Sequence, residues 1–334
     1  MTSSQAILNG DRLALARLLT QVENNSQEGR SSLMELFPHT GKAHLIGVTG
    51  APGTGKSSLV NQLALHYRKN ENKRIAIVAI DPSSPFTGGA VLGDRVRMRD
   101  LSGDPNVFIR SMASRGSLGG LAQATANVVQ VFDAAGFDIV IVETVGAGQS
   151  EVDIARLAHT TLVVEAPGLG DDIQAIKAGI LEIADILVVN KADRPGVENT
   201  EKALKTMLEL AHPAERVFKH HGVSMKVEAP KQKPTTAMWI PPIQRTVSTE
   251  GTGVPELVHA IGRHVAHLRL SGDWSLRERT RLEVELEALI RDGLMNQFRD
   301  SITTQQYEET MESVIQRKIS PWEAASTLMN GRKP

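Results

Sequence analysis

Apolar and polar positions follow two alternating patterns over most of the chain. Short apolar runs predict strands at residues 44–49, 74–80, 106–111, 138–143, 160–164, 185–190 and 243–247, and apolar positions at helical spacing predict helices at 56–69, 118–135 and 173–183. The runs at 75–80 and 139–142 contain no polar residue, which is typical of parallel strands covered by helices on both faces. We therefore predict a doubly wound α/β domain with a mostly parallel sheet, whose ligands bind at the carboxyl ends of the strands.

Helical patterns flank this domain at both ends. Residues 5–22 carry an apolar stripe interrupted at 9–11, residues 23–30 are a polar segment expected to be a linker, and residues 31–37 add one or two helical turns. After Gly272, amphipathic helices are predicted at 276–299, 303–318 and 321–330. Such a tail folds back on the core or pairs with another chain, because it cannot bury its apolar stripe alone. The predicted domains are an N-terminal helical arm at 1–41, the α/β domain at 42–272 and a C-terminal helical extension at 273–334.

Charge and composition exclude several kinds of partner and chemistry. The 37 Lys and Arg residues nearly balance the 38 Asp and Glu residues, so no overall field favours nucleic acid or an anionic membrane as a partner. The absence of cysteine excludes disulfides, thiolate metal sites and a cysteine nucleophile, and is compatible with a reducing compartment. Residues 1–10 lack the pattern of a secretory leader, and no apolar run reaches membrane-spanning length. We expect a cytoplasmic protein with no membrane segment.

The most specific motif is Gly-Ala-Pro-Gly-Thr-Gly-Lys-Ser at residues 50–57, between a predicted strand and a predicted helix. The spacing G-x-x-x-x-G-K-S is that of a phosphate-binding loop (P-loop), in which backbone N–H groups cradle phosphates at the positive end of the next helix. Lys56 would reach the β and γ phosphates, and Ser57 would hold Mg²⁺. The nucleotide-binding residues expected here are Gly50, Gly53, Thr54, Gly55, Lys56, Ser57 and Ser58.

Two acidic residues follow the second predicted strand. Asp81 begins the segment Asp-Pro-Ser-Ser-Pro, at the end of the strand next to the P-loop, and could orient Mg²⁺ or its waters. Asp94 lies in the glycine-containing segment that follows, where a metal-binding role and a water-orienting role are both open. A turn capped by Asp81 is the simpler alternative.

A third acidic residue, Glu143, ends the apolar strand at 138–143, where P-loop proteins place a carboxylate that binds Mg²⁺ or a metal-bound water. Gly146 could present its backbone N–H to a γ phosphate and lose that contact after hydrolysis, as switch loops do. Gln149 could orient the attacking water. The alternative is an ordinary glycine turn between a strand and a helix, with Ser150 as the N-cap.

The identity of the base is indicated by Asn-Lys-Ala-Asp at residues 190–193, which ends another apolar strand. The carboxylate of Asp193 can accept hydrogen bonds from guanine N1–H and the 2-amino group together, whereas adenine offers no such pair of donors. Lys191 would cover the base plane, and Asn190 would brace neighbouring loops. Ser248 and Thr249 follow the last strand and fit a loop that backs the guanine. The sequence thus predicts a preference for GTP and GDP.

These motifs together resemble the MeaB/ArgK-type GTPases of the SIMIBI class of P-loop proteins. The resemblance is carried by residues 50–57, 81–85, 93–97, 114–120, 143–151, 168–172, 190–193 and 239–242. It implies a GTP-hydrolysing switch with slow basal turnover that a partner stimulates. It also implies a chaperone of adenosylcobalamin-dependent acyl-CoA mutases, typically methylmalonyl-CoA mutase, and homodimerisation through the C-terminal extension.

Roles for individual residues also follow from the resemblance. Lys56 and Ser57 would lie at the phosphates and Mg²⁺, with Asp81, Asp94 and Glu143 as the acidic residues around the metal. Residues 166–177 would form a third switch. Either Lys177 from this switch, or Arg95 and Arg97 near Asp94, could supply positive charge to the reaction. Many GTPases place an Ala after the Ser of the guanine-backing loop, whereas this chain has Thr249. No cobalamin-binding D-x-H-x-x-G pattern occurs, so we expect that cofactor to belong to the partner.

Two other classes of function remain open from the sequence. A partitioning or metallochaperone-type ATPase usually has an additional early Lys in the P-loop, where this chain has Ala51 and Pro52. A P-loop kinase, including one linked to amino-acid transport, would need a substrate pocket or lid. Slow cleavage of GTP with no phosphorylated acceptor would distinguish a switch from both.

Several other residues receive no catalytic role. His259, His264 and His267 lie on a predicted helix without a partnering carboxylate motif, so we expect them to be solvated or to cap the helix. Trp239 is expected to anchor the core or a loop, and the polar segment at 220–234 is expected to be an exposed excursion before the last strand.

Overall fold

The computed structural model of the chain describes residues 3–82, 98–101, 103–114, 120–144, 150–168, 182–211, 217–220, 223–226 and 238–330. The chain forms two compact units, residues 1–280 and residues 281–334. Among the residues described, no helix is both long and apolar enough to cross a membrane.

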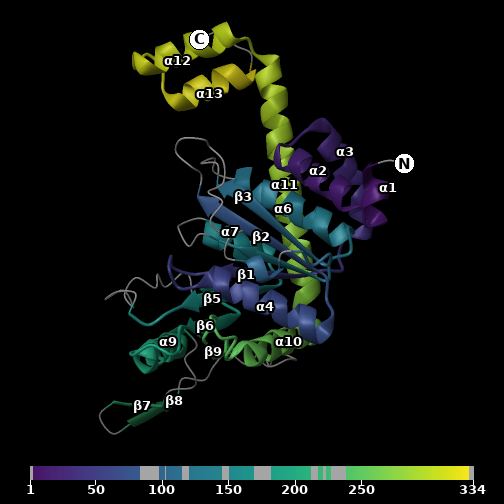
Figure 1. The fold of residues 1–334 in the computed structure, drawn as a ribbon. Coiled ribbons are helices and arrows are strands. Elements are labelled where there is room, and N and C mark those ends of the chain that lie inside the picture. The colour runs from purple at the N-terminus through teal and green to yellow at the C-terminus, as the bar shows by residue number, and fades with distance from the viewer. Residues whose placement is uncertain are drawn as a thin grey trace. The chain divides into compact units, whose positions relative to one another are not determined.

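The first unit is built on a seven-stranded, all-parallel sheet with the strand order β3-β2-β4-β1-β5-β6-β9 (Figure 1). The strands are β1 (His44–Thr49), β2 (Ile75–Pro82), β3 (Val107–Ser114), β4 (Ile139–Glu143), β5 (Thr160–Glu165), β6 (Ile186–Asn190) and β9 (Ile243–Thr246). The chain moves outward from β1 to β2 and β3, returns to insert β4 next to β1, and then continues on the other side with β5. The reversal at β1 is a topological switch point, where ligands bind in doubly wound folds. The predicted fold class is confirmed.

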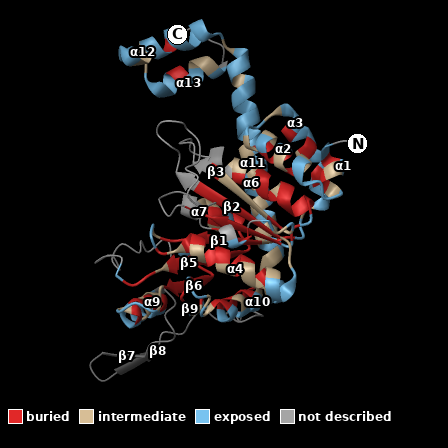
Figure 2. Ribbon diagram, viewed as in Figure 1, coloured by how far each residue is buried: buried red, intermediate tan, exposed pale blue. Residues whose placement is uncertain are grey.

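Helices cover both faces of this sheet. One face packs against α4 (Lys56–Glu71) and α10 (Val254–Ser271), and the other against α6 (Gly120–Ala134), α7 (Ser150–Leu157) and α9 (Val197–Ala211). Alternate residues of one strand therefore enter different cores: Ile75 and Ile77 pack with α4, whereas Ala76 and Val78 pack with α6. Figure 2 shows the strands as the most buried part of this unit, which explains why their sequences are continuously apolar.

One glycine is required for this packing. A Cβ atom at Gly47, in the centre of β1, would lie 2.5 Å from the Cγ2 atom of Ile154 and 3.1 Å from the Cβ atom of Ala158. Helix α7 can therefore approach the central strand only because residue 47 has no side chain.

The N-terminal helices are α1 (Ser3–Leu8), α2 (Arg12–Glu23) and α3 (Gln27–Leu36), followed by the 3₁₀ turn η1 (Phe37–His39). Helices α2 and α3 and the turn η1 pack on α6, and α1 packs on α2 and α3. Asp11 caps α2 by accepting hydrogen bonds from the N–H groups of Leu13 and Ala14. The linker expected at 23–30 is wrong for its second half, because Ser26 caps α3 by accepting from the N–H of Gly29. Gly29 fits closely against α2, since a Cβ there would lie 2.9 Å from the carbonyl of Gln21.

Two elements between α9 and β9 were not predicted. Strands β7 (Val217–His220) and β8 (Val223–Lys226) form an antiparallel pair that is separate from the main sheet. The rest of the excursion expected at 220–234, and the helix expected at 173–183 except for its last two residues, lie outside the described residues.

The C-terminal helices are α11 (Asp273–Ser301), α12 (Thr304–Ile315) and α13 (Pro321–Asn330). Thr303 and Gln306 form a capping box at the start of α12. The three predicted amphipathic helices are thus present, and the first of them begins three residues earlier than predicted.

Candidate nucleotide-binding site

The P-loop follows β1 and is enclosed by two neighbouring strands. Gly50 has a φ of 138°, and a Cβ atom there would lie 2.1 Å from the carbonyl oxygen of Val164 at the end of β5. Gly55 has a φ of 93°, and a Cβ atom there would lie 2.4 Å from Nδ2 of Asn190 at the end of β6. Both positions therefore exclude any side chain on conformational and steric grounds.

Lys56 and Ser57 begin helix α4, so they lie at its positive end. The Nζ atom of Lys56 donates hydrogen bonds to the carbonyl oxygens of Gly50 at 2.8 Å and Ala51 at 3.0 Å. The Oγ atom of Ser57 donates to Oε1 of Glu143 at 2.6 Å. A lysine ammonium group and a hydroxyl–carboxylate pair thus meet at the mouth of the loop.

Sheet register places Glu143 beside the P-loop. Glu143 is the last residue of β4 and pairs with Val48 of β1, two residues before Gly50. The next residue, Thr144, donates from its hydroxyl to the hydroxyl of Thr49 at 3.0 Å, and both side chains are fully buried. Sequence analysis missed this pair, because two Thr residues that follow apolar runs in distant parts of the chain carry no motif of their own.

The second half of the site is organised by Asn190, which is buried. Its Nδ2 atom donates to the carbonyl oxygen of Thr54 at 2.8 Å and lies 3.4 Å from that of Gly55. Its Oδ1 atom accepts hydrogen bonds from the Thr246 hydroxyl at 3.0 Å and from Oγ of Ser248 at 2.7 Å. One side chain therefore joins the P-loop, β6 and the loop after β9. Thr246 was also missed by sequence analysis, because a Thr at the end of a strand is common.

Of the remaining residues of the Asn-Lys-Ala-Asp motif, Lys191 contacts the P-loop. Lys191 has a φ of 57°, and its Nζ atom donates to the carbonyl oxygen of Gly53 at 2.5 Å. The side chain of Asp193 is exposed and makes no hydrogen bond or ion pair with the parts of the chain that the structure describes. A free carboxylate can accept two donors from a base edge. Thr249 is exposed, whereas Ser248 is buried against Asn190.

Other predicted site residues lie wholly or partly outside the described part of the chain. Asp94, Gly146, Gln149 and Lys177 are in segments that the structure does not describe. The backbone of Asp81 lies near the carboxyl end of β2, where it pairs with Ala113 of β3, and its side chain is not described. Their roles stay predictions.

The side chains beside the P-loop suit Mg²⁺, which needs few protein ligands, better than a metal that is held by several side chains. No group of three or more His, Cys, Asp and Glu side chains able to hold a metal is found among the residues described. Mg²⁺ prefers oxygen ligands and is usually bound by one or two protein groups together with phosphates and waters. The oxygen atoms of Ser57 and Glu143, 2.6 Å apart, match that donor set.

The parallel sheet, the P-loop at its switch point and the adjoining Asn190 contacts define a nucleotide-binding protein of the P-loop class. The family model described as "Methylmalonyl Co-A mutase-associated GTPase MeaB" matches residues 15–303. The chain therefore belongs to the MeaB family of GTPases.

Individual relatives match over nearly the whole chain. A protein of Pyrococcus abyssi (strain GE5 / Orsay) that is named as a GTPase is 44% identical over 320 residues, which are 96% of this chain and 93% of its own length. The "Methylmalonic aciduria type A homolog, mitochondrial" of Caenorhabditis elegans is 29% identical over 97% of this chain and 81% of its own. Among solved structures, "LAO/AO transport system kinase" matches with a TM-score of 0.68 and 26% identity, covering 98% of this chain and 95% of that one.

Proposed function

We propose that the chain is a GTP-hydrolysing switch that acts as a chaperone for an adenosylcobalamin-dependent acyl-CoA mutase. The observation that supports the nucleotide part best is the Asn190 side chain, which bonds to the P-loop backbone and to Ser248 at once. Asp193 follows Asn190 by three residues and its side chain is exposed, which supports a site that uses the P-loop and the Asp193 carboxylate together. Phosphates and a guanine base of one nucleotide would be bound there together.

The residues of the P-loop would carry the phosphates. Lys56 would exchange its bonds to the carbonyl oxygens of Gly50 and Ala51 for bonds to the β and γ phosphates. Ser57 and Glu143 would hold Mg²⁺, which, when bound, neutralises charge that develops on the phosphates. Most of the rate would then come from positioning and electrostatics.

The attacking water and any further positive charge belong to residues outside the described ranges. Asp94 and Gln149 are our candidates for orienting the water, and Lys177 is our candidate for supplying charge. We expect basal turnover to be slow and a partner to stimulate it, because an incomplete set of charges leaves the transition state poorly stabilised.

The proposed client is supported by names alone. The family description associates its members with methylmalonyl-CoA mutase, and the Caenorhabditis elegans relative is named for methylmalonic aciduria. We propose a mutase of this class as the partner, with adenosylcobalamin bound by the mutase, and we propose roles in cofactor loading, protection and reactivation.

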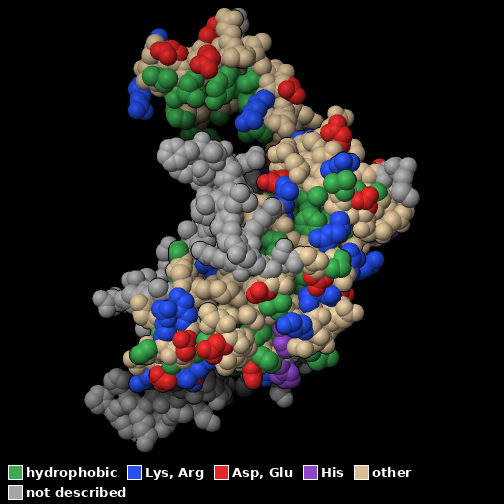
Figure 3. All heavy atoms as spheres, viewed as in Figure 1, with side chains coloured by type: hydrophobic (Ala, Val, Ile, Leu, Met, Phe, Trp, Pro, Cys, Tyr) green, Lys and Arg blue, Asp and Glu red, His purple; other side chains and the backbone are tan. Residues whose placement is uncertain are grey.

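The C-terminal extension is the proposed site of homodimerisation. Along α11, apolar side chains at helical spacing are exposed in the single chain: Leu282, Leu286, Leu289, Ile290 and Leu294. Figure 3 shows further hydrophobic side chains gathered over α12 and α13, where Met311, Ile315 and Trp322 are exposed. Exposed apolar surface of this extent is typical of a surface that another chain covers.

The direct experiment measures phosphate release from GTP and from ATP, with and without an adenosylcobalamin-dependent methylmalonyl-CoA mutase. We expect slow GTP cleavage, faster cleavage with the mutase, and no activity in Lys56→Ala, which has no ammonium group to place on the phosphates. Equal turnover with and without the mutase would contradict the chaperone role. Preferential use of ATP would contradict the guanine assignment.

A second candidate function is phosphoryl transfer to an acceptor, because the matched solved structure is named as a transport system kinase. The same assay distinguishes the two when it uses γ-labelled nucleotide. Label in inorganic phosphate supports the switch, whereas label in a protein or small-molecule acceptor supports the kinase.

A further inference from the structure

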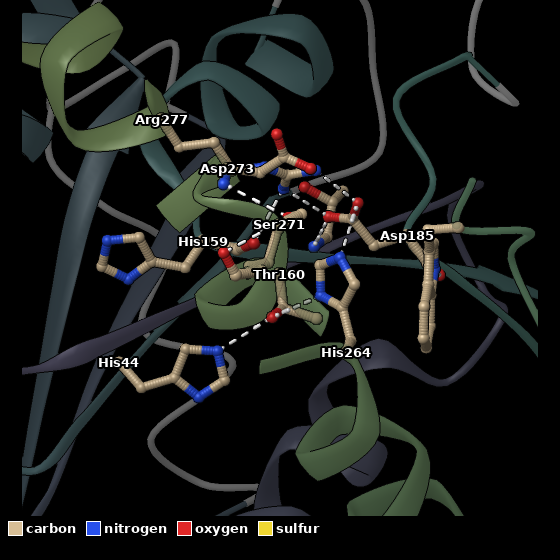
Figure 4. A network of polar contacts seen from close by, with 11 residues as sticks. His44, His159, Thr160, Asp185, His264, Ser271, Asp273 and Arg277 are labelled. Carbon is tan, nitrogen blue, oxygen red and sulfur yellow. Dashed lines mark hydrogen bonds and ion pairs between the residues drawn. The ribbon is translucent and has the colours of Figure 1, made fainter. Parts of the chain in front are cut away.

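A second network of polar side chains lies at the amino ends of the strands, on the edge of the sheet opposite the nucleotide site (Figure 4). His44 begins β1, Thr160 begins β5 and Asp185 directly precedes β6. His264 comes from α10, and Arg277 comes from the first two turns of α11. All five belong to the unit of residues 1–280.

Asp185 is the centre of this network. Its carboxylate accepts two hydrogen bonds from the Arg277 guanidinium, at 2.7 and 2.8 Å, one from the N–H of Thr161 at 2.8 Å, and a contact from Nε2 of His264 at 3.2 Å. Burial acts to raise the pKa of Asp185, but the hydrogen bonds from His264 and Arg277 outweigh it and lower the pKa to about 2. The carboxylate is therefore ionised when Arg277 is bound.

Thr160 and His44 extend the network to β1. The Thr160 hydroxyl lies 3.0 Å from Nδ1 of His264 and 2.8 Å from Nε2 of His44, so it links the two rings. Burial, together with the neighbouring His159 and His264, lowers the pKa of His44 to about 3. The His44 ring is thus neutral in the assembled network.

His159 fixes the start of α11 in a different way. Its Nδ1 atom accepts a hydrogen bond from the N–H of Leu45 at 3.0 Å, and its Nε2 atom pairs with the Glu278 carboxylate. The ring stacks on Trp274 with 3.9 Å between ring centroids, and the backbone carbonyl of His159 accepts from Arg277 at 2.7 Å.

This arrangement requires a neutral His159 ring. Protonation would place an N–H group at Nδ1, opposite the Leu45 N–H, and the hydrogen bond between them would be lost. The charged and titratable groups around the rings are His44 from β1, Asp185 before β6, His264 and Arg269 from α10, and Asp273, Arg277 and Glu278 from α11. A proton on the His44 ring is disfavoured by burial and by the neighbouring His159, His264 and Arg269, and Asp185 offsets this only in part.

We propose that His44, His159, Thr160, Asp185, His264 and Arg277 form an acid-sensitive latch, which holds residues 273–280 of α11 against the amino ends of β1, β5 and β6 and releases them at mildly acidic pH. The nucleotide site lies at the other ends of β1 and β6 and stays folded when the latch opens. The attachment of residues 273–280 to the sheet would then respond to pH separately from the rest of the fold.

Hydrogen–deuterium exchange of the full chain at pH 7.5 and pH 5.5 tests this, after correction for the intrinsic pH dependence of exchange. We expect amides of 273–280 to exchange at least about tenfold faster at the lower pH, while β1 and β4 stay protected. His159→Asn keeps an oxygen acceptor for Leu45 and cannot take up a proton near neutral pH, so the pH dependence of its exchange in 273–280 should be smaller than that of the wild type. No nucleotide is needed, so the result is independent of the guanine proposal.

Arg277→Met provides a second variant, and it should open residues 273–280 at both pH values. Its matched control is Arg245→Met, which removes an arginine that pairs with Glu201 on the surface of α9 and should leave exchange in 273–280 unchanged. Wild-type protection of the amides of β1 and β4 in Arg277→Met would show that the sheet is intact. Unchanged exchange in Arg277→Met, or loss of protection in β1 and β4 together with 273–280, would overturn the proposal.

Discussion

Asn190 connects three parts of the nucleotide site through one side chain. It donates to the carbonyl oxygen of Thr54 and accepts from Thr246 and Ser248, and all of these contacts are buried. Asn190 belongs to the motif expected to bind the base, and its side chain also holds the phosphate-binding loop in place. Loss of this residue should affect the binding of phosphates as well as of guanine.

Substitution of Asn190 tests this bridge. Asn190→Ala leaves buried hydroxyl and carbonyl groups without partners, and a loss of about 2–4 kcal/mol in unfolding free energy is expected. GDP affinity should fall by more than about tenfold. Urea unfolding and calorimetric titration with GDP measure the two effects. Thr249→Ala, at an exposed neighbouring position, is the control and should change neither by more than about 0.5 kcal/mol.

The hydroxyl pair of Thr49 and Thr144 makes a second residue-scale prediction. Thr144→Val keeps the shape of the side chain but removes the donor to Thr49, beside Glu143. We expect a loss of about 1–2 kcal/mol in stability and a lower kcat for GTP, because Glu143 is less firmly placed. Thr144→Ser should restore both. A kcat of Thr144→Val equal to that of the wild type would show that the pair serves stability alone.

At the scale of elements, the network that contains His44 makes stability depend on pH. The folded-state pKa of His44 is about 3, below the usual value of about 6.5 for an unfolded chain. Between these pH values the unfolded state binds the additional proton, so this contribution is complete above pH ~6.5 and declines as pH falls toward 3, by at most about 1.4 kcal/mol per pH unit.

Urea unfolding between pH 7.5 and pH 5 measures this decline. His44→Gln cannot take up the proton, so its stability should fall less steeply over the same range than that of the wild type. His66→Gln, at a partly buried histidine of α4 outside this network, is the matched control. Identical slopes for His44→Gln and the wild type would contradict this assignment.

The elements also show what the sequence could and could not predict. The strands predicted at 44–49 and 138–143 are present as β1 and β4, and they could be predicted because burial of both faces leaves a continuous apolar run. The start of α3 was missed, because it depends on the Ser26 cap and on the fit of Gly29 against α2, which is a tertiary contact.

The expectation of a solvated histidine is wrong for His264, which is buried against Asp185 and Thr160. Its partners Thr160 and Asp185 precede it by 104 and 79 residues in the chain, so no local pattern contains the network. At the nucleotide site the motifs predicted which loops meet. Each motif directly follows a predicted parallel strand, and the carboxyl ends of such strands lie on the same edge of the sheet. The polar contacts between the loops, such as Thr246 to Asn190, could not be predicted.

At the scale of the whole molecule, we predict that two chains associate through the exposed apolar stripe of α11. Leu289→Asp places a charge in the exposed apolar stripe of α11, where the side chain is 53% exposed, and should convert a dimer to a monomer in light scattering. Leu13→Asp, at a similar exposure of 60% on α2, is the control and should leave the mass unchanged. A Leu289→Asp protein that remains dimeric would contradict dimerisation through this stripe.

A truncation can test the same point if it preserves the base of α11. Arg277 bonds to Asp185, so removal of residues 273–334 would leave the Asp185 carboxylate without its arginine partner. Truncation after Thr280 avoids this and should give a monomer that still binds GDP.

Recognition of a guanine nucleotide through Asp193 is the central claim, and one competition measurement tests it most directly. A fluorescent GDP analogue is displaced from the wild type and from Asp193→Asn by GDP, ADP and XDP. For the wild type, GDP should bind far more tightly than ADP or XDP. In Asp193→Asn, the amide donates to the 2-oxo group of xanthine and cannot accept from both guanine donors, so the preference should change from GDP to XDP. An Asp193→Asn protein that keeps the wild-type preference for GDP would contradict guanine recognition by this carboxylate.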